Sequence, residues 1–177
     1  MPILPFRNIL PTVALDAFVA EGAVVIGDVH IGGESGIWFG CVVRGDVNHV
    51  RIGDRTNIQD GTIVHVTRVK FPTMIGNDVT VGHAAMLHGC VLEDGCFIGM
   101  RAIVMDGAVV ESGAWVAAGA LVPPGKRIPK GQVWAGVPAK YLRDMTPEEI
   151  AYIPVSAQNY AELAREYREG DQNATDR

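Results

Sequence analysis

Large aliphatic residues recur at steps of six along most of the chain, and small residues, Gly or Asp fill the positions between them. The aliphatic series comprises Val19, Val25, Ile31, Ile37 and Val43, then Ile52, Ile58 and Val64, then Ile75, Val81 and Leu87, and finally Leu92, Ile98, Val104, Val110, Val116 and Val122. A helix has a period of 3.6 residues and a half-buried strand alternates every two, so neither produces this step. The pattern therefore predicts a repeated structural unit of six residues.

A six-residue unit fits a short strand followed by a tight corner, as in VVIGDV (24–29) and IGNDVT (75–80). One aliphatic side chain points inward, and the small or turn-prone residues bend the chain into the next side. Three such sides close a triangular coil, and stacked coils form an all-β solenoid, a parallel β-helix with a buried aliphatic column. A β-sandwich with regular turns is the alternative, but its strands recur every 8–12 residues, so the step of six favours the solenoid.

The repeat is interrupted at Asn48–Arg51 and at Val66–Met74. A solenoid accepts insertions as loops outside its coil, and functional residues often lie beside such loops. After Val122, prolines end the regular repeat. We expect an N-terminal lead-in at 1–18, the β-helix domain at 19–125, a connecting segment at 126–145, a helical segment at 146–170 and a frayed tail at 171–177.

The helical segment begins with a good capping sequence, because Thr146 is suited to the N-cap position and Pro147 to the first helical position. A second helical stretch is expected over roughly Ser156–Glu169. Its Tyr160, Leu163, Ala164 and Tyr167 form a stripe that should pack along the coil.

Composition narrows the function classes. The length of 177 residues fits one domain, and a formal net charge of −5 argues against nucleic acid as a partner, because phosphate binding needs a basic surface. The N-terminal residues form neither a secretory signal nor a membrane span, so we expect a cytoplasmic protein that does not bind membranes. The three cysteines, Cys41, Cys90 and Cys96, lie in apolar runs and are expected to be reduced.

Three of the five histidines are close together in the repeat. His65 and His83 are 18 residues apart, which is one turn of a triangular coil, so they could lie on the same side of neighbouring coils about 4.8 Å apart. His88 then follows on the next side. Three imidazoles with one open position are typical of a catalytic zinc site, whereas a single histidine is more often a surface or hydrogen-bonded residue. On spacing alone both interpretations stay open.

Four motifs together carry a specific resemblance: RGDV (44–47), NIQDG (57–61), the His65 segment VHV, and VGHAAMLHGC (81–90). In order and spacing they resemble the γ-class carbonic anhydrases and their bacterial relatives. The resemblance implies a left-handed β-helix, a homotrimer, and reversible hydration of CO₂ to bicarbonate by a metal-bound hydroxide between subunits. It assigns His65 and His88 of one chain and His83 of the next as ligands of Zn²⁺, although three-histidine sites also accept Fe²⁺ or Co²⁺.

The same motifs suggest roles for further residues. Gln59 is suited to hydrogen-bond the hydroxide, and Asn57 is suited to hold Gln59. Arg44 can pair with Asp46 or Asp60 across the subunit boundary, although these three residues could equally form a purely structural ion-pair set. Tyr160 resembles a C-terminal tyrosine that some relatives place near the metal, with simple packing as the alternative.

The resemblance is weaker where a proton must leave the site. The family's best-studied type has glutamates after RGD and in the loop that follows the first metal histidine. This chain has Val47 and the loop VTRVKFPT (66–73) there, and neither offers a carboxylate. His49 has a suitable imidazole pKa but lies in an exposed-looking loop. Metal binding is thus better supported than rapid catalysis. The alternatives are an acyltransferase that uses acyl-coenzyme A, or a metal-binding scaffold with little or no activity.

Overall fold

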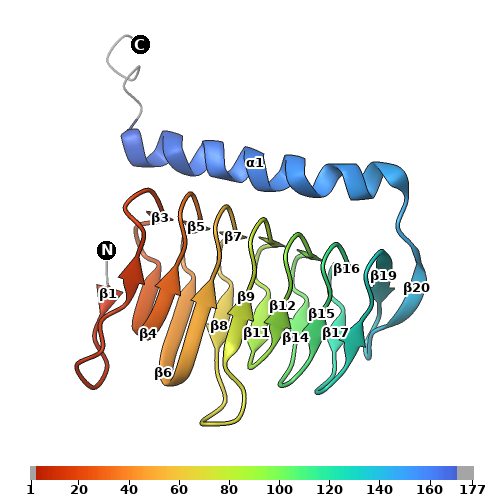
Figure 1. Ribbon diagram of the computed structural model, residues 1–177, viewed down its shortest axis with the longest axis horizontal. Helices are drawn as coiled ribbons and strands as arrows, with labels where there is room; N and C mark the ends of the chain where they lie inside the picture. Colours follow the sequence, from red (N-terminus) through yellow and green to blue (C-terminus); the bar gives the residue numbers. More distant parts are fainter. Residues whose placement is uncertain (1–2, 171–177) are drawn as a thin grey trace.

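The computed structural model describes residues 3–170; the predicted frayed tail, 171–177, lies outside the described residues. The chain forms a parallel β-solenoid, and one C-terminal helix, α1 (Pro147–Glu169), runs along its length (Figure 1). The predicted all-β solenoid with a C-terminal helix is therefore confirmed.

Each coil of the solenoid contributes one strand to each of three faces. Face 1 contains β1 (Ile3–Leu4), the first parts of β4 (Val24–Ile31) and β6 (Val42–Ile52), β8 (Ile63–His65), β11 (Met86–His88), β14 (Ile103–Val104) and β17 (Leu121–Val122). Face 2 contains β2 (Thr12–Val13), the later parts of β4 and β6, β9 (Thr73–Ile75), β12 (Val91–Leu92), β15 (Val109–Val110) and β18 (Arg127–Ile128).

Face 3 contains β3 (Phe18–Val19), β5 (Gly36–Ile37), β7 (Asn57–Ile58), β10 (Thr80–Val81), β13 (Phe97–Ile98), β16 (Trp115–Val116) and β19 (Gln132–Ala135). These strands pair in parallel, and β20 (Lys140–Asp144) closes the end of the face by pairing antiparallel with β19. Strands β1 and β2 lie within residues 1–18, and β18 to β20 lie within residues 126–144, so the strand pairing extends on both sides of the region 19–125.

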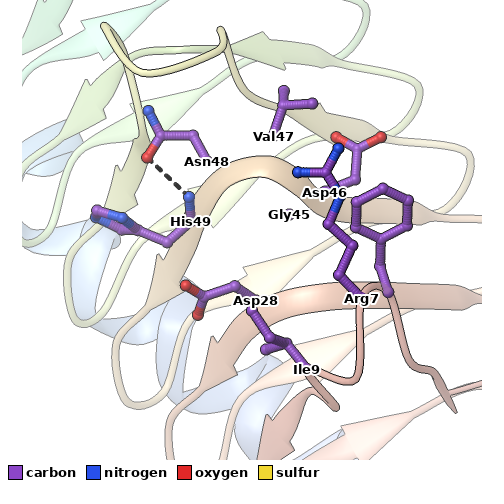
Figure 2. Close-up of a pocket in the computed structure, with 9 residues that line it drawn as sticks. Arg7, Ile9, Asp28, Gly45, Asp46, Val47, Asn48 and His49 are labelled. Atoms are coloured by element: carbon purple, nitrogen blue, oxygen red, sulfur yellow. Dashed lines mark hydrogen bonds between the residues drawn. The ribbon is translucent and has the colours of Figure 1, made fainter.

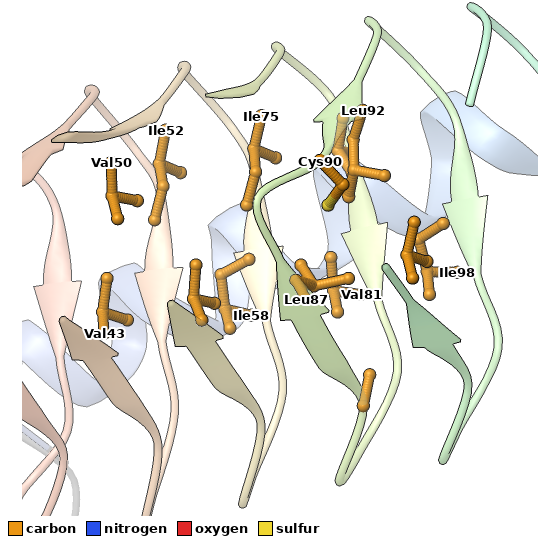
Figure 3. Packing of buried hydrophobic residues seen from close by; sticks show 14 of the residues in the cluster. Val43, Val50, Ile52, Ile58, Ile75, Val81, Leu87, Cys90, Leu92 and Ile98 are labelled. Atoms are coloured by element: carbon orange, nitrogen blue, oxygen red, sulfur yellow. The ribbon is translucent and has the colours of Figure 1, made fainter. Parts of the chain in front are cut away.

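The aliphatic positions of the repeat form the core. Val81 is in register with Ile58 on one side and Ile98 on the other, and all three side chains are fully buried. Figure 3 shows the same stacking for Ile52, Ile75 and Leu92, which are in register on face 2. Burying each such side chain stabilises the fold by roughly 1.5–3 kcal/mol, so the column is the main source of stability.

Both interruptions of the repeat lie at the edge between faces 1 and 2. In the pairing of β4 with β6, Gly27 is opposite Gly45 but Val29 is opposite Val50, so residues 46–49 bulge outward. The second interruption is a small hairpin between β8 and β9, closed by pairing of Thr67 with Phe71. In Figure 1 both project from the lower edge, away from helix α1. They are called here the 46–49 bulge and the 66–72 hairpin.

Helix α1 is continuous, so the prediction of two separate helical stretches is wrong, and Pro154 lies inside the single helix. The predicted N-cap is confirmed: the Thr146 hydroxyl accepts from the backbone N–H of Glu149, whose carboxylate accepts from the N–H of Thr146. The predicted stripe is largely confirmed: Ala164 is buried, and Tyr160 and Tyr167 pack against aromatic rings of the coil, whereas Leu163 is exposed. The helix packs on face 3, against β3, β5, β7 and β10, through mostly small residues: Ile153, Ser156, Ala157, Ala161 and Ala164.

No helix within residues 3–170 is both long and apolar enough to cross a membrane.

Candidate metal centre

His65 and His88 lie side by side at the edge between faces 1 and 2, which we call the paired edge. They occupy matching positions at the ends of β8 and β11, where their Cα atoms are direct partners in the ladder. Their ring centroids are 5.1 Å apart, and Nδ1 of His65 is 3.1 Å from Nε2 of His88. The strand register alone therefore aligns the two imidazoles.

This pairing corrects the expectation from spacing, which stacked His65 on His83. The stacked residues are 23 apart in sequence rather than 18, because the 66–72 hairpin lengthens this coil. His83 instead follows β10, at the edge between faces 3 and 1. The grouping implied by the family resemblance, His65 with His88, agrees with this arrangement.

A carboxylate contacts the second ring nitrogen of each paired histidine. Asp46 Oδ1 lies 3.0 Å from Nε2 of His65, and Asp106 Oδ1 lies 2.5 Å from Nδ1 of His88. Asp46 belongs to the 46–49 bulge, whereas Thr67, in the 66–72 hairpin, donates its hydroxyl to Asp106 Oδ2 at 2.7 Å. Both interruptions of the repeat thus supply groups that orient the histidines.

These contacts keep both carboxylates ionised. Partial burial disfavours the charge of Asp46, but the hydrogen bonds from His65 and Arg44 outweigh it and lower the pKa of its carboxyl. At Asp106, burial is likewise outweighed by His88 and Thr67, which lower the pKa of that carboxyl. Ionised carboxylates behind imidazoles fix ring orientation and make the rings better metal ligands.

The opposite edge of face 1, between faces 3 and 1, carries a single histidine, and we call it the single edge. His83 Nδ1 is 2.8 Å from Asp60 Oδ2, and both side chains are well exposed, at 46% and 44%. At the paired edge, the corresponding values are lower, at 18% and 14% for His65 and Asp46 and at 31% and 29% for His88 and Asp106. His83 is therefore oriented by a carboxylate too, but it faces solvent in the isolated chain.

The donor set suits a zinc-like ion. Each of His65, His83 and His88 has one ring nitrogen on a carboxylate and the other nitrogen available. At the paired edge, the two nitrogens that do not contact a carboxylate are 3.1 Å apart. A tetrahedral ion with Zn–N bonds of about 2.0–2.1 Å needs its two nitrogen ligands about 3.3 Å apart, which is close to this distance. Among residues 3–170, however, one chain brings no three ligands into position for a single ion. One chain therefore supplies only part of such a site.

Gln59 and Asn57 lie beside the single edge, on the outer side of face 3 under helix α1. Gln59 Nε2 donates to Asn57 Oδ1 at 3.0 Å, and both side chains are buried. Tyr160 packs edge-on against Trp38 with ring centroids 5.6 Å apart. Burial, and secondarily the nearby charge of Asp60, raises the pKa of its phenol. The structure therefore places Gln59, Asn57 and Tyr160 on the same side of the coil as His83 and away from the paired edge.

Arg44 is at the paired edge and forms an ion pair with Asp46 of its own chain. Asp60, the other partner considered for it, contacts His83. Sequence analysis did not single out Asp106 or Thr67. Asp106 could have been found, since it follows His88 by 18 residues, one regular coil. Thr67 carries no such signal because it belongs to an irregular loop.

A cavity of about 220 Å³ lies on the outer side of the paired edge, between the N-terminal residues and the 46–49 bulge. Arg7 and Ile9 lie on one side and Val47 and His49 on the other (Figure 2). Two carboxylates also line it, and both are paired, Asp46 with Arg44 and Asp28 with Arg51 at 2.8 Å. Val47, the residue that follows the RGD motif, thus lines this cavity with an aliphatic side chain and offers no carboxylate there.

The fold defines a hexapeptide-repeat β-solenoid, and its three carboxylate-oriented histidines are candidate metal ligands. Comparison with known proteins identifies the family. The chain is 40% identical to a carbonic anhydrase of Geobacillus kaustophilus over 98% of its own length and 94% of the relative's. It is 50% identical to a probable carbonic anhydrase of Methanocaldococcus jannaschii over 82% and 91%. It is 56% identical to γ carbonic anhydrase 2, mitochondrial, of Arabidopsis thaliana, over 88% of this chain but only 58% of that protein. The chain belongs to the γ-carbonic anhydrase family.

Solved structures agree on the fold. A hexapeptide transferase family protein from Anaplasma phagocytophilum superposes with a TM-score of 0.91 at 48% identity, covering 94% of this chain and 98% of that one. A putative acetyltransferase from Bacillus cereus gives 0.92 at 40% identity, covering 94% and 96%. A scan against models of known families finds no match.

Proposed function

We propose that the protein catalyses the reversible hydration of CO₂ to bicarbonate at metal sites formed between the subunits of a homotrimer. The observation that carries this proposal is the paired edge, where two available imidazole nitrogens lie 3.1 Å apart with a carboxylate behind each ring. Family membership supports the reaction, and the position of His83 at the opposite edge of the same face supports assembly.

Face 1 has the surface expected of a subunit interface. Its outward side carries a column of apolar side chains that are partly or well exposed in the isolated chain, with Ile63 at 41% and Met86 at 39%. Their neighbours in the column are Val24, Val42, Ile103 and Leu121. Contiguous exposed apolar surface is typical of interaction sites. A contact that joins the paired edge of one copy to the single edge of the next is heterologous, and a rotation of about 120° between copies would close it into a ring of three.

In this assembly His65 and His88 of one chain and His83 of the next would hold the ion. When bound, a zinc-like ion lowers the pKa of its water ligand to about 7, which supplies a nucleophile at neutral pH. Asp46, Asp106 and Asp60 orient the three rings. Gln59 offers a carbonyl oxygen to hydroxyl groups in the site. Since Val47 has no carboxyl group, we expect buffer to carry the proton away.

Mixing two inactive variants tests the division of ligands between chains. His83→Ala and His88→Ala each remove one ligand from every site, so each homotrimer should lack metal and CO₂ hydration. In a mixed trimer, the paired edge of a His83→Ala chain meets the intact His83 of a His88→Ala chain. Refolding the two in equal amounts should restore about a quarter of wild-type sites if subunits associate at random. Metal content and stopped-flow CO₂ hydration would be measured.

The matched control mixes His65→Ala with His88→Ala. Both substitutions damage the paired edge, so no intact site can form and activity should stay at background. Restoration in this control, or none in the first mixture, would contradict sites shared between chains. Fully metallated wild type without hydration activity in concentrated buffer would refute the enzymatic proposal and favour a metal-binding scaffold.

An acyltransferase is the second candidate, because the Bacillus cereus structure is described as a putative acetyltransferase. That chemistry needs one histidine base and an acyl-coenzyme A site, and it does not require carboxylates behind three histidines. Binding of coenzyme A to metal-free protein, with no metal taken up by the paired edge, would support it instead.

Two finer points remain proposals. We propose Zn²⁺ as the metal, with Fe²⁺ or Co²⁺ also accommodated by three imidazoles, and metal analysis of protein purified without added ions would identify it. The cytoplasmic location stays a prediction from the N-terminal residues, whereas the name of the Arabidopsis relative places that protein in mitochondria.

A further inference from the structure

Four buried polar side chains form a continuous hydrogen-bonded row from helix α1 to Gln59. Ser156 Oγ on the helix is 3.0 Å from Thr80 Oγ1, and Asn57 Nδ2 donates to Thr80 Oγ1 at 3.0 Å. Gln59 Nε2 donates in turn to Asn57 Oδ1 at 3.0 Å. Ser156, Thr80, Asn57 and Gln59 are each at most 5% exposed. A buried polar row this complete is costly to assemble unless every member is satisfied.

The contacts of Asn57 show which end of each side-chain amide in the row donates and which accepts. Asn57 Nδ2 also lies 3.5 Å from the backbone carbonyl oxygen of Val79, which can only accept a hydrogen bond. The amide nitrogen of Asn57 therefore faces Val79 and Thr80, and its oxygen faces Gln59; the 3.5 Å contact with Val79 is long, so the 3.0 Å bond to Thr80 provides most of this preference. Gln59 then has to present its NH₂ group to Asn57, which leaves Oε1 as the outward atom.

The outward oxygen is available to the site. Gln59 Oε1 accepts no hydrogen bond from residues 3–170 in the structure. In that part of the chain, Trp38 Nε1 is the one fully buried side-chain nitrogen or oxygen without a partner, so Gln59 Oε1 is accessible from outside. Gln59 directly precedes Asp60, which contacts His83, so this acceptor lies at the single edge.

We propose that Thr80 and Ser156 are positioning residues that lock the Gln59 amide with its oxygen toward the metal site. Thr80 Oγ1 accepts from Asn57 and lies 3.0 Å from Ser156 Oγ; in the proposed arrangement the Thr80 hydroxyl donates to Ser156, and this last bond completes the row. Without the Ser156 oxygen, the buried Thr80 hydroxyl needs another acceptor, and Asn57 Oδ1 is the nearest group able to rotate toward it. That rotation would reverse Gln59 and present NH₂ groups, which are donors only, to the site.

The inference deepens the proposed function and rests on it for its effect on rate, but the amide orientation can be measured without metal. In metal-free protein, NMR would follow the side-chain NH₂ signal of Gln59, assigned through its loss in Gln59→Glu. In the wild type, this NH₂ is buried against Asn57 and should exchange slowly with solvent. In Ser156→Ala and in Thr80→Val, we expect a shifted signal and exchange about tenfold faster, as for loss of one buried hydrogen bond.

The matched control is Ser35→Ala, which removes an equally buried serine hydroxyl that donates to the Gly53 carbonyl, accepts from the Thr56 backbone N–H and takes no part in the row. It should leave the Gln59 signal unchanged. Thr80→Ser retains the hydroxyl and should restore slow exchange. If Ser156→Ala and Thr80→Val leave the Gln59 amide as in the wild type, or if Thr80→Ser fails to restore it, the inference is overturned.

With metal added, Ser156→Ala and Thr80→Val should lower kcat for CO₂ hydration about tenfold while metal content stays at the wild-type level. A wild type without hydration activity would remove the proposed function, yet the NMR comparison would still decide the orientation of Gln59. An active wild type with unchanged kcat in both variants would overturn the positioning role alone.

Discussion

The two edges of face 1 carry the same kind of residue pair in opposite settings. At the paired edge, two histidines and two aspartates are partly buried and linked to one another; at the single edge, His83 and Asp60 stand alone and exposed. Strand register stacks the paired histidines, and loops outside the repeat supply their supports, whereas His83 sits at an ordinary corner. In the proposed assembly, the paired edge would hold the ion and the single edge of the next chain would complete the site.

The largest expected difference concerns the carboxylates behind the rings. Asp106→Asn should weaken metal binding about 10–100-fold, because it removes the acceptor that orients His88 and strengthens it as a ligand. Asp60→Asn should weaken binding by less, because Asp60 is more exposed, at 44% against 29% for Asp106, whereas Asp106 is also held by the Thr67 hydroxyl. Competition titration with a chelator would measure both. Equal losses for the two variants would remove the proposed distinction between the edges.

The sequence was sufficient for the solenoid because every coil repeats the same inward position. Val81, Ile58 and Ile98 are identifiable from spacing alone, and the structure buries all three in register. The capping residue Thr146 was also readable, since its bonds to Glu149 are local. Properties that repeat or act locally can be read from the sequence without a structure.

The site was less predictable because it depends on departures from the repeat. A regular step of 18 residues would pair His65 with His83. The 66–72 hairpin adds residues to this coil, so the partner of His65 lies 23 residues further on, at His88. The role of Pro154 was likewise hidden, since a proline usually marks a helix break, yet here the helix continues because it packs on face 3. An insertion hides the spacing in the first case, and tertiary packing overrides the local signal in the second.

The next largest effect is on stability at the paired edge. Gly89 follows His88 with a φ of +56°, and an added Cβ would lie 2.7 Å from Asp106 Oδ1 and 2.8 Å from Phe71 Cβ. Gly89→Ala should therefore lower the free energy of unfolding by about 2 kcal/mol, about half from the backbone and half from these contacts. Gly119→Ala, at φ +68° with open space around it, should cost only about 1 kcal/mol. Urea unfolding would compare them, and equal losses would show that the contacts do not matter.

A smaller effect is expected at the start of helix α1, which covers the face next to the single edge. The two hydrogen bonds from Arg143, at 2.7 Å, and the bond from the Thr146 backbone lower the pKa of Glu149 from 4.5 to about 2. Glu149 thus stabilises the fold above about pH 4.5, and this contribution disappears as the pH falls toward 2. Glu149→Gln should lower stability by about 1 kcal/mol at pH 7.

Thermal unfolding of the wild type and Glu149→Gln between pH 7 and pH 2.5 would test the sign. The two melting temperatures should converge as the pH decreases. A gap that stays constant would show that the charge of Glu149 is irrelevant to helix docking.

The last prediction concerns Cys90, the buried thiol next to the paired edge, which we expect to be unreactive in the folded protein. Burial raises the pKa of Cys90 to about 12 and that of Cys41 to about 11, and all three cysteines are free and buried. Iodoacetamide at pH 8 should leave the folded protein unmodified and label all three thiols in urea. Labelling of Cys90 in the folded state would indicate that the paired edge opens.

The 66–72 hairpin shows how a repetitive protein can acquire a feature that its repeat does not contain. Shortening or lengthening a strand by one residue would turn every following side chain to the wrong face. A loop outside the coil has no such restriction: its length changes the number of residues between His65 and His88, while every later residue keeps its place in the coil and the core is undisturbed. In this architecture, chemical sites can change by loop insertions and deletions alone, and differences in loop length between related solenoids are the places to look for differences in activity.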